Sequence, residues 1–249
     1  MKCLETLSIA VLFTTTASLA QTQGERMLPS IKQLNEKGLQ EQVWKRQELS
    51  KRDRHLVTIA SAIARNEPSL LKTEMNLGLD SGLTPEEING MITHLAIYAG
   101  YGKALEASNI AQEVFNARNI DVGALIDNEP QLFAIDAKAE AARLKAVDEA
   151  TGGLFEHLAD DTTNVLFNDL WLRPDLTPRD RSLITVTALL ANGQVGQIGF
   201  HLNKAMDNGL TATQAEEVLS HLAYYVGWPN AFSAIPVMKE VIQNRSQSN

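Results

Sequence analysis

The chain has 249 residues, of which 44% are hydrophobic and 21% charged, so it can bury a core and is neither disordered nor of low complexity. Its 22 Lys and Arg against 30 Asp and Glu give a formal net charge of −8, which argues against a nucleic-acid partner because phosphate binding needs a basic surface. The single cysteine excludes an intramolecular disulfide, a CxxC redox pair and a cysteine-based zinc site.

The first twenty residues are predicted to be a signal peptide. Lys2 supplies its positive charge, an apolar stretch runs from Leu7 to Phe13, and Ser18-Leu19-Ala20 forms a small-x-small cleavage site. This stretch is too short for a membrane span, and no later stretch reaches the required length. We therefore expect an exported chain, periplasmic or secreted, that begins at Gln21 and has lost its one cysteine, Cys3. The alternative is a buried N-terminal helix.

Two copies of one unit follow. When the chain is aligned with itself, Trp44 pairs with Trp171, an offset of 127 residues (171 − 44), and the match continues without a gap over about 64 positions. The aligned segments include Arg52-Asp53-Arg54 with Arg179-Asp180-Arg181, Gly82-Leu83-Thr84 with Gly209-Leu210-Thr211, and His94-Leu95-Ala96 with His221-Leu222-Ala223.

The repeat divides the chain into five segments. They are the signal peptide (1–20), an N-terminal tail and helix (21–43), the first copy (44–118), a connecting segment (119–168) and the second copy (169–245). Within the connecting segment we expect a helix from Asp136 to Glu149, which is rich in Ala, Lys and Glu. Each copy has faces that need burial, so we expect the two copies to pack together and not to form independent domains.

Both copies are predicted to be helical. Ser50 and Thr177 are N-cap residues, each followed three residues later by an aspartate, and Thr84 with Glu87 and Thr211 with Gln214 repeat this pattern. Helices are expected at about 181–192, 197–208, 212–226 and 231–244, with Gly209 and Gly227 as stops. No stretch shows sustained period-two alternation, so the fold class is all-α.

His201 is the leading candidate for chemistry. It aligns with Glu74 of the first copy, so the repeated fold does not require it, and it lies four residues after Gln197 on the same helix face. Its neighbours Ile198 and Leu202 place it on or near the buried face. A histidine there is either a neutral core residue or a general acid/base in a pocket, and its absence from the first copy favours the second role.

His221 and His94 occupy equivalent positions in the two copies, which favours a role in helix packing over one in chemistry. Tyr225 follows His221 by four residues, so these two side chains can share a face and a site. A metal site is not expected, because no carboxylate stands three or four residues after His201.

Three arginines, Arg173, Arg179 and Arg181, lie within nine residues of the second copy. Guanidinium groups can bind carboxylates bidentately. The repeated Arg-Asp-Arg triplet is also explained by a solvated helix start or by salt bridges to the other copy, and its repetition favours those structural roles. Trp228, after the stop at Gly227, is either the rim of a pocket or a plug for the core.

The second copy contains the pattern Trp171-x-Arg173-Pro174-x-Leu176-x-x-Arg179-x-Arg181-Ser182-Leu183, followed by His201, Asn208-Gly209 and Tyr225-x-Gly227-x-Pro229. This pattern resembles the carboxymuconolactone decarboxylase family, which belongs to the alkyl-hydroperoxidase D-like superfamily. The resemblance is strong over about residues 165–240 and weaker over 44–115, which implies a tandem-repeat form of the family.

The resemblance implies two packed alkyl-hydroperoxidase D-like helical units, assembly as a homo-oligomer, and a lyase without cofactors that removes a carboxylate from a small unsaturated lactone acid. It also implies that Arg181 or Arg173 holds the carboxylate and that His201 protonates the carbanion. Decarboxylase members are expected to carry a glutamate where this chain has Gln197, which cannot transfer a proton. The peroxide-reducing branch uses a CxxC pair, so the lack of cysteine at this helix disfavours peroxidase activity.

We therefore interpret the sequence as an exported carboxymuconolactone decarboxylase-like enzyme that acts on a small carboxylated lactone or organic acid. The expected catalytic residues are His201 and Gln197, and the expected substrate-binding residues are Arg181, Arg173, His221, Tyr225 and Trp228. The alternative is a non-catalytic helical oligomer that binds a small ligand or partner, which Gln197 and the degenerate first copy favour. No cofactor, metal, nucleic acid or membrane span is expected.

Overall fold

The computed structural model describes residues 27–125 and 129–247. These residues form eleven α-helices and no strand, which confirms the predicted all-α fold. The predicted signal peptide at 1–20, with Cys3, lies outside the described residues. None of the helices in the described part of the chain is both long enough and apolar enough to cross a bilayer.

The helices repeat along the chain with the offset found in the sequence. In the first copy they are α2 (Pro29–Gln33), α3 (Lys51–Arg65), α4 (Pro68–Asp80), α5 (Pro85–Tyr98) and α6 (Tyr101–Ala117). In the second copy they are α8 (Glu156–Asp161), α9 (Pro178–Ala191), α10 (Val195–Asp207), α11 (Ala212–Val226) and α12 (Trp228–Gln247). Each helix of the second copy begins 127 residues after its counterpart, at 29 and 156, 51 and 178, 68 and 195, 85 and 212, and 101 and 228.

Four further helical segments, which are not α-helical, and one connecting α-helix complete the described fold. The four segments are η1 (Leu34–Val43), η2 (Val122–Leu125), η3 (Thr162–Phe167) and η4 (Leu170–Leu172). The connecting helix is α7 (Ala137–Thr151), and the side chain of Asp136 caps its N-terminus. Because α2 and α8 obey the same offset, the repeated unit extends further toward the N-terminus than the sequence alignment does.

The predicted N-caps start the helices. Ser50 and Thr177 accept hydrogen bonds from the backbone N–H groups three residues later, which satisfies donors that have no partner inside the helix. Thr84 with Glu87, and Thr211 with Gln214, form complete capping boxes. These local signals fix where each helix begins and, through the offset, give the two copies the same element order.

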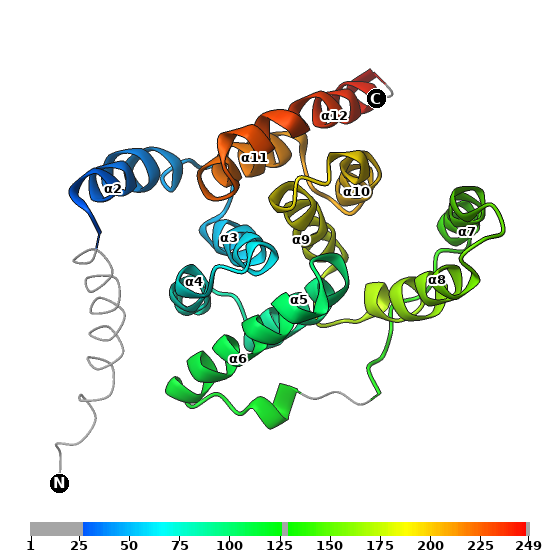
Figure 1. The fold of residues 1–249 in the computed structure, drawn as a ribbon, viewed down its shortest axis with the longest axis horizontal. Helices are drawn as coiled ribbons and strands as arrows, with labels where there is room; N and C mark the ends of the chain where they lie inside the picture. Colours follow the sequence, from blue (N-terminus) through cyan, green and yellow to red (C-terminus); the bar gives the residue numbers. More distant parts are fainter. Residues whose placement is uncertain (1–26, 126–128, 248–249) are drawn as a thin grey trace, which may run out of the picture.

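Helices α3 and α9 lie side by side at the centre of the molecule (Figure 1). Every residue from Asp53 to Ala64 in α3, and from Asp180 to Ala191 in α9, is buried, as expected for helices that are covered on all sides. Helix α3 packs against α4 of its own copy and against α9 and α11 of the other, while α9 packs against α10, α3 and α5. The two copies therefore share one core.

Charged residues at the N-termini of α3 and α9 join the two copies. Arg52 Nη2 lies 2.8 Å from Asp180 Oδ2, and Arg179 Nη2 lies 2.7 Å from Asp53 Oδ2. Each arginine also binds the aspartate that follows it in sequence, at 3.0 and 2.9 Å. Arg52 and Arg179 thus form salt bridges to the other copy, one of the roles left open for the Arg-Asp-Arg triplets. The four side chains close a ring of ion pairs.

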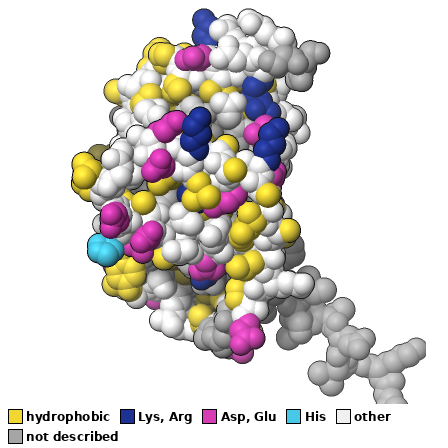
Figure 2. All heavy atoms as spheres, turned by 90° about the vertical axis from the view of Figure 1, so that its right-hand side faces the viewer, with side chains coloured by type: hydrophobic (Ala, Val, Ile, Leu, Met, Phe, Trp, Pro, Cys, Tyr) yellow, Lys and Arg dark blue, Asp and Glu magenta, His cyan; other side chains and the backbone are white. Residues whose placement is uncertain are grey.

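Helices α7 and α8 lie at the periphery, on the right-hand side of Figure 1. The face turned to that side carries hydrophobic side chains scattered among acidic and basic ones, without separation into one apolar area (Figure 2). Residues of α7, among them Glu140 and Arg143, line a cavity together with residues of the second copy.

We predict that Arg179→Ala lowers the free energy of unfolding by about 3 kcal/mol, because it leaves the buried carboxylate of Asp53 without its partner from the other copy. Chemical denaturation at neutral pH measures the change. The matched control is Lys72→Ala, which breaks an exposed ion pair with Glu113 and should cost less than about 1 kcal/mol. Equal effects of the two substitutions would contradict a stabilising role for the ring.

Candidate functional site

The aligned residues gather into two clusters, and each cluster is built from both copies. The first contains Trp44, Arg54 and Thr58 of the first copy with His221 and Tyr225 of α11. The second contains the residues at the same offset positions, which are Trp171, Arg181 and Thr185 of the second copy with His94 and Tyr98 of α5. Each copy therefore completes the cluster of the other.

His221 is held by hydrogen bonds at both ring nitrogens. The hydroxyl of Thr58 donates its hydrogen to the carbonyl of Arg54 at 2.7 Å, so it accepts from His221 Nε2 at 2.8 Å. His221 Nδ1 then accepts from Arg54 Nη1 at 3.3 Å. Burial, together with the charge of Arg54, lowers the pKa of His221 to about 3, so the ring is neutral at neutral pH.

His94 repeats this arrangement in the second cluster. The hydroxyl of Thr185 donates to the carbonyl of Arg181, so His94 Nε2 donates to the hydroxyl at 2.7 Å. Arg181 Nη1 lies 3.5 Å from His94 Nδ1. Burial, followed by the charge of Arg181, lowers the pKa of His94 well below its usual value. Both histidines thus use their ring nitrogens to hold helices of the two copies together.

The two buried arginines obtain their counter-charges in different ways. Arg54 Nη1 binds Glu217 of α11 at 2.7 Å. At the corresponding position of α5 the chain has Gly90, and a side-chain carbon there would lie 2.7 Å from the carboxyl carbon of Asp175. Arg181 instead binds Asp175, from the loop before α9. In the first cluster the carboxylate therefore comes from α11 of the other copy. In the second cluster it comes from the loop that precedes α9 in the same copy.

The clusters differ most where the two copies differ in sequence. His55 on α3 aligns with Ser182 on α9, and Glu74 on α4 aligns with His201 on α10. His55 Nδ1 lies 2.8 Å from Glu74 Oε2, whereas Ser182 donates to the carbonyl of Pro178. The histidine of the first copy is therefore paired with a carboxylate. His201 has no such partner among the residues that the structure describes.

His201 lies among aromatic rings, with only 8% of its surface exposed. Its ring centroid is 6.1 Å from Trp171, 5.4 Å from Tyr98 and 5.1 Å from Phe200. Burial, and then the charge of Lys204, lowers the pKa of His201 to about 4. Its Nδ1 is buried and has no hydrogen-bond partner within the described ranges.

A cavity of about 430 Å³, here called the His201 cavity, is lined by Trp171 and Phe200, whose rings contact His201; His201 itself is not among its lining residues. Its lining includes Trp171, Phe200 and Lys204, whose Nζ lies 4.9 Å from the centroid of the Trp171 ring. Burial lowers the pKa of Lys204, against the opposing effect of nearby carboxylates. Arg143 of α7 also lines the cavity; it is buried, binds Glu140 at 2.8 and 2.6 Å, and has an Nη1 without a partner among the described residues.

A second cavity of about 430 Å³ adjoins His55 and Glu74, which both line it together with Trp44 and Tyr225. Trp44 Nε1 donates to the Tyr225 hydroxyl at 3.1 Å. Burial raises the pKa of Tyr225, so the phenol keeps its proton. Two cavities of similar size are thus found among the described residues: His55 lines one of them, and two rings that contact His201 line the other.

The structure separates most of the residues that the sequence assigned to one site. His221 and Tyr225 lie in the first cluster, beside His55 and away from His201. Gln197 is exposed and is not among the residues that line the His201 cavity. Trp228 contacts Tyr224 in a third cavity, of about 240 Å³.

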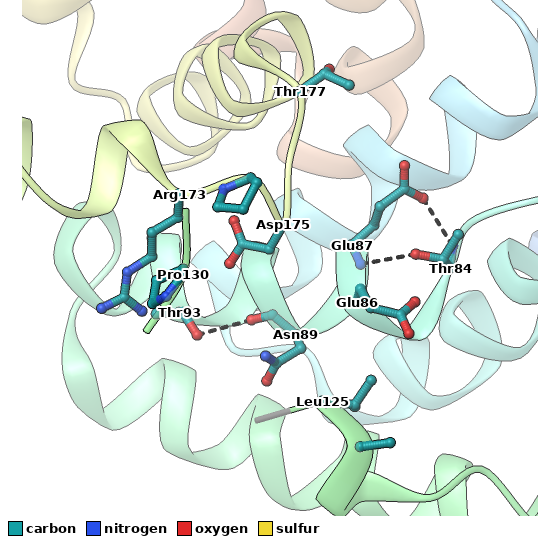
Figure 3. A pocket seen from close by; sticks show the side chains of 12 residues that line it. Thr84, Glu86, Glu87, Asn89, Thr93, Leu125, Pro130, Arg173, Asp175 and Thr177 are labelled. Carbon is teal, nitrogen blue, oxygen red and sulfur yellow. Dashed lines mark hydrogen bonds between the residues drawn. The ribbon is translucent and has the colours of Figure 1, made fainter. Parts of the chain in front are cut away.

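The two predicted arginines are already paired within the protein. Arg181 is fully buried and bound to Asp175, its Nη1 lies 3.5 Å from His94 Nδ1, and it is not among the residues that line the His201 cavity. Arg173 binds Asp169 at 3.0 and 2.8 Å. It lines a cavity of about 570 Å³ that also contains Asp175, which faces helix α5 (Figure 3).

His55, Glu74 and Lys204 are not among the site residues predicted from the sequence. For His55 a signal was present, since the comparison that isolates His201 against Glu74 also isolates His55 against Ser182. For Lys204 the sequence gives no signal, because a lysine in the last turn of a helix is also an ordinary surface residue. No group of three or more His, Cys, Asp or Glu in the described residues is arranged to hold a metal ion.

Comparisons with known proteins agree with the repeat. The model of the family described as "Carboxymuconolactone decarboxylase family" matches residues 29–113 and 156–240. The chain is 32% identical over 78 residues to 4-carboxymuconolactone decarboxylase of Acinetobacter baylyi, a match that covers 31% of this chain and 58% of that protein. It is 29% identical over 82 residues to nitrosuccinic acid decarboxylase of Metarhizium robertsii, covering 33% of this chain and 57% of that protein. The chain thus spans less than two thirds of the length of either relative.

We predict that His221 makes the protein less stable in acid. Its pKa is about 3 in the folded state and about 6.5 when unfolded. Between these two values the His221 ring is protonated in the unfolded state and neutral in the folded state. Stability is therefore lost as the pH falls from 6.5 toward 3. Between pH 7 and pH 5 this group should remove about 2 kcal/mol from the free energy of unfolding.

Chemical denaturation at the two pH values measures this loss, and His221→Gln should reduce it by that amount. The matched control is His157→Gln, at an exposed position in α8, which should keep the wild-type difference. The same difference in wild type and His221→Gln would contradict a histidine held neutral by its surroundings.

Proposed function

This chain belongs to the carboxymuconolactone decarboxylase family, and on that premise we propose that it is a decarboxylase that uses no cofactor and acts on a small carboxylated lactone or organic acid. In this proposal His201 is the acid/base. The names of both relatives describe the removal of carbon dioxide from a small carboxylic acid. The proposal extends that reaction class to this chain.

The observation that carries the proposal is the setting of His201. Its buried Nδ1 has no partner in the described parts of the chain, its ring contacts Trp171 and Phe200, which both line the cavity, and Lys204 is one turn further along α10. A histidine with a purely structural role would be expected to use both ring nitrogens, as His94 and His221 do.

The reaction needs a stabilised carbanion and a proton. When the bond between the carboxyl carbon and its neighbour breaks, the electron pair stays on the neighbour and spreads to a conjugated oxygen. Lys204 and Arg143 both line the cavity, and the Nη1 of Arg143 has no partner among the described residues. The two cationic side chains supply positive charge for that oxygen. Charge stabilisation of this kind is strongest in a site that excludes water.

The proton then comes from His201. The free enzyme holds this ring neutral, but a bound carboxylate favours the protonated form, so substrate binding draws a proton from solvent. The imidazolium transfers that proton to the carbanion and returns to its neutral state. Overall, one proton is consumed and one carbon dioxide leaves, which balances the reaction.

The alternative function is binding without turnover. It is supported by the absence of a carboxylate partner for His201 within the described residues and by the exposed position of Gln197. Under this alternative the cavity holds a small carboxylated ligand without loss of carbon dioxide.

We predict that the purified wild type releases carbon dioxide from 4-carboxymuconolactone and that His201→Gln lowers kcat at least about 100-fold, because the proton donor is lost. His157→Gln is the control and should keep full activity. An active His201→Gln variant would rule out the role of His201. A wild type that binds the lactone without releasing carbon dioxide would establish the alternative.

A separate prediction concerns the proton drawn in by substrate. Binding of 5-oxotetrahydrofuran-2-carboxylate, a saturated lactone acid that cannot delocalise the electron pair, should be accompanied by net proton uptake at pH 7. Titration calorimetry in phosphate and in Tris buffer measures this uptake as the difference in heat between the buffers. His201→Gln should bind without it. Equal uptake in the variant would assign the proton to another group at the cavity and contradict the role of His201.

A further inference from the structure

We propose that the cavity of the first copy is a second acid/base site, in which His55 is a general base positioned by Glu74 and the ligand is a small, largely apolar carbonyl compound with an acidic C–H bond. This proposal does not rest on the decarboxylase function. It rests on the His55–Glu74 pair, on the cavity that both side chains line, and on the charge around them.

Glu74 sets the hydrogen positions on His55. The two side chains come from neighbouring helices, α3 and α4, and His55 Nδ1 lies 2.8 Å from Glu74 Oε2. An ionised carboxylate can only accept a hydrogen bond, so Nδ1 carries the hydrogen and Nε2 carries the lone pair. Nε2 of His55 thus has the electronic form that a base requires.

The lone pair on His55 Nε2 accepts no hydrogen bond from the described part of the chain. His55 is 3% exposed, and its Nε2 is buried without a hydrogen-bond partner in the described portion of the chain. His94 and His221, in contrast, bond through both ring nitrogens. A buried nitrogen left without a partner costs stability, and a ligand that supplies a hydrogen would remove that cost.

The cavity favours a compound with little charge. Leu39, Leu70 and Leu77 form much of its apolar wall, together with the Trp44 ring, which lies 4.5 Å from the His55 ring. Lys51 is the one cationic side chain among the described residues that line it, and it is exposed. The His201 cavity, in contrast, is bordered by the half-buried Lys204 and the buried Arg143.

The two histidines therefore have opposite charged neighbours. The carboxylate of Glu74 lies 2.8 Å from His55 Nδ1 and can hold the ring while Nε2 takes up a proton, whereas burial and then the ammonium of Lys204 lower the pKa of His201. The first arrangement suits removal of a proton from a substrate, and the second suits delivery of a proton to one.

The proton transfer at the first site balances without any added reagent. Nε2 of His55 takes the proton from a carbon next to a carbonyl group, and the electron pair of the broken C–H bond moves onto the carbonyl oxygen as an enolate. Tyr225, which keeps its proton, lines the cavity as a donor for that oxygen. The imidazolium then returns the proton to the same carbon or to the far end of a conjugated enolate, which shifts the double bond.

The probe for this activity is α-angelica lactone, whose ring CH₂ lies between a carbonyl group and a double bond. Proton NMR in deuterated water follows the loss of the CH₂ signal and the appearance of the conjugated isomer. We expect the wild type to accelerate both, and His55→Gln to reduce the acceleration at least about 100-fold. His157→Gln is the control and should match the wild type. A wild-type rate no greater than that of His55→Gln would overturn the proposal.

Two further variants keep the test decisive if His55→Gln does not fold. Glu74→Gln keeps the shape of the side chain but removes its charge, so it should lower kcat with little change in KM. Leu77→Phe fills the cavity and leaves the His55–Glu74 pair in place, so it should raise KM. A Glu74→Gln variant with wild-type kcat, or a Leu77→Phe variant with wild-type KM, would contradict the proposed site.

Discussion

The ring of ion pairs between α3 and α9 sets the arrangement of the molecule. Arg52 and Arg179 each bind the aspartate of the other copy, which holds the N-termini of the two central helices together. These helices are buried along nearly their whole length, so the helices around them have few other positions available. In this arrangement α11 packs on α3 and α5 packs on α9, and each cluster of polar residues therefore contains side chains from both copies.

Within that arrangement, the repeated residues build the fold and the unrepeated ones create chemical differences. His94 and His221 are neutral and bonded through both nitrogens, so they act as fixed parts of the core. His55 and His201 have no histidine at the equivalent position in the other copy. One has a carboxylate partner and the other has a lysine nearby. The two copies thus hold two histidines with opposite electrostatic surroundings. Two identical copies could not provide this difference.

The sequence alone predicts the repeated helices well, because the caps at Ser50, Thr84, Thr177 and Thr211 are local signals. It does not predict which copy completes which cluster. His201 and His221 are close in sequence, yet His221 lies beside His55, since α11 packs across the molecule onto α3. The replacement of Glu217 by Gly90, with Asp175 filling the space, is likewise a contact between distant segments, and no periodicity or spacing records it.

The most direct test of this account is the tautomer of each buried histidine, measured by long-range nitrogen–proton NMR correlation at neutral pH on protein labelled with ¹⁵N-histidine. The hydrogen bonds require the Nε2–H form for His94 and His221 and the Nδ1–H form for His55. Observation of these three forms would establish that the fold holds its buried histidines in two different tautomers. An Nε2–H form for His55 would contradict the account, because Glu74 would then not be the carboxylate that sets its hydrogen positions.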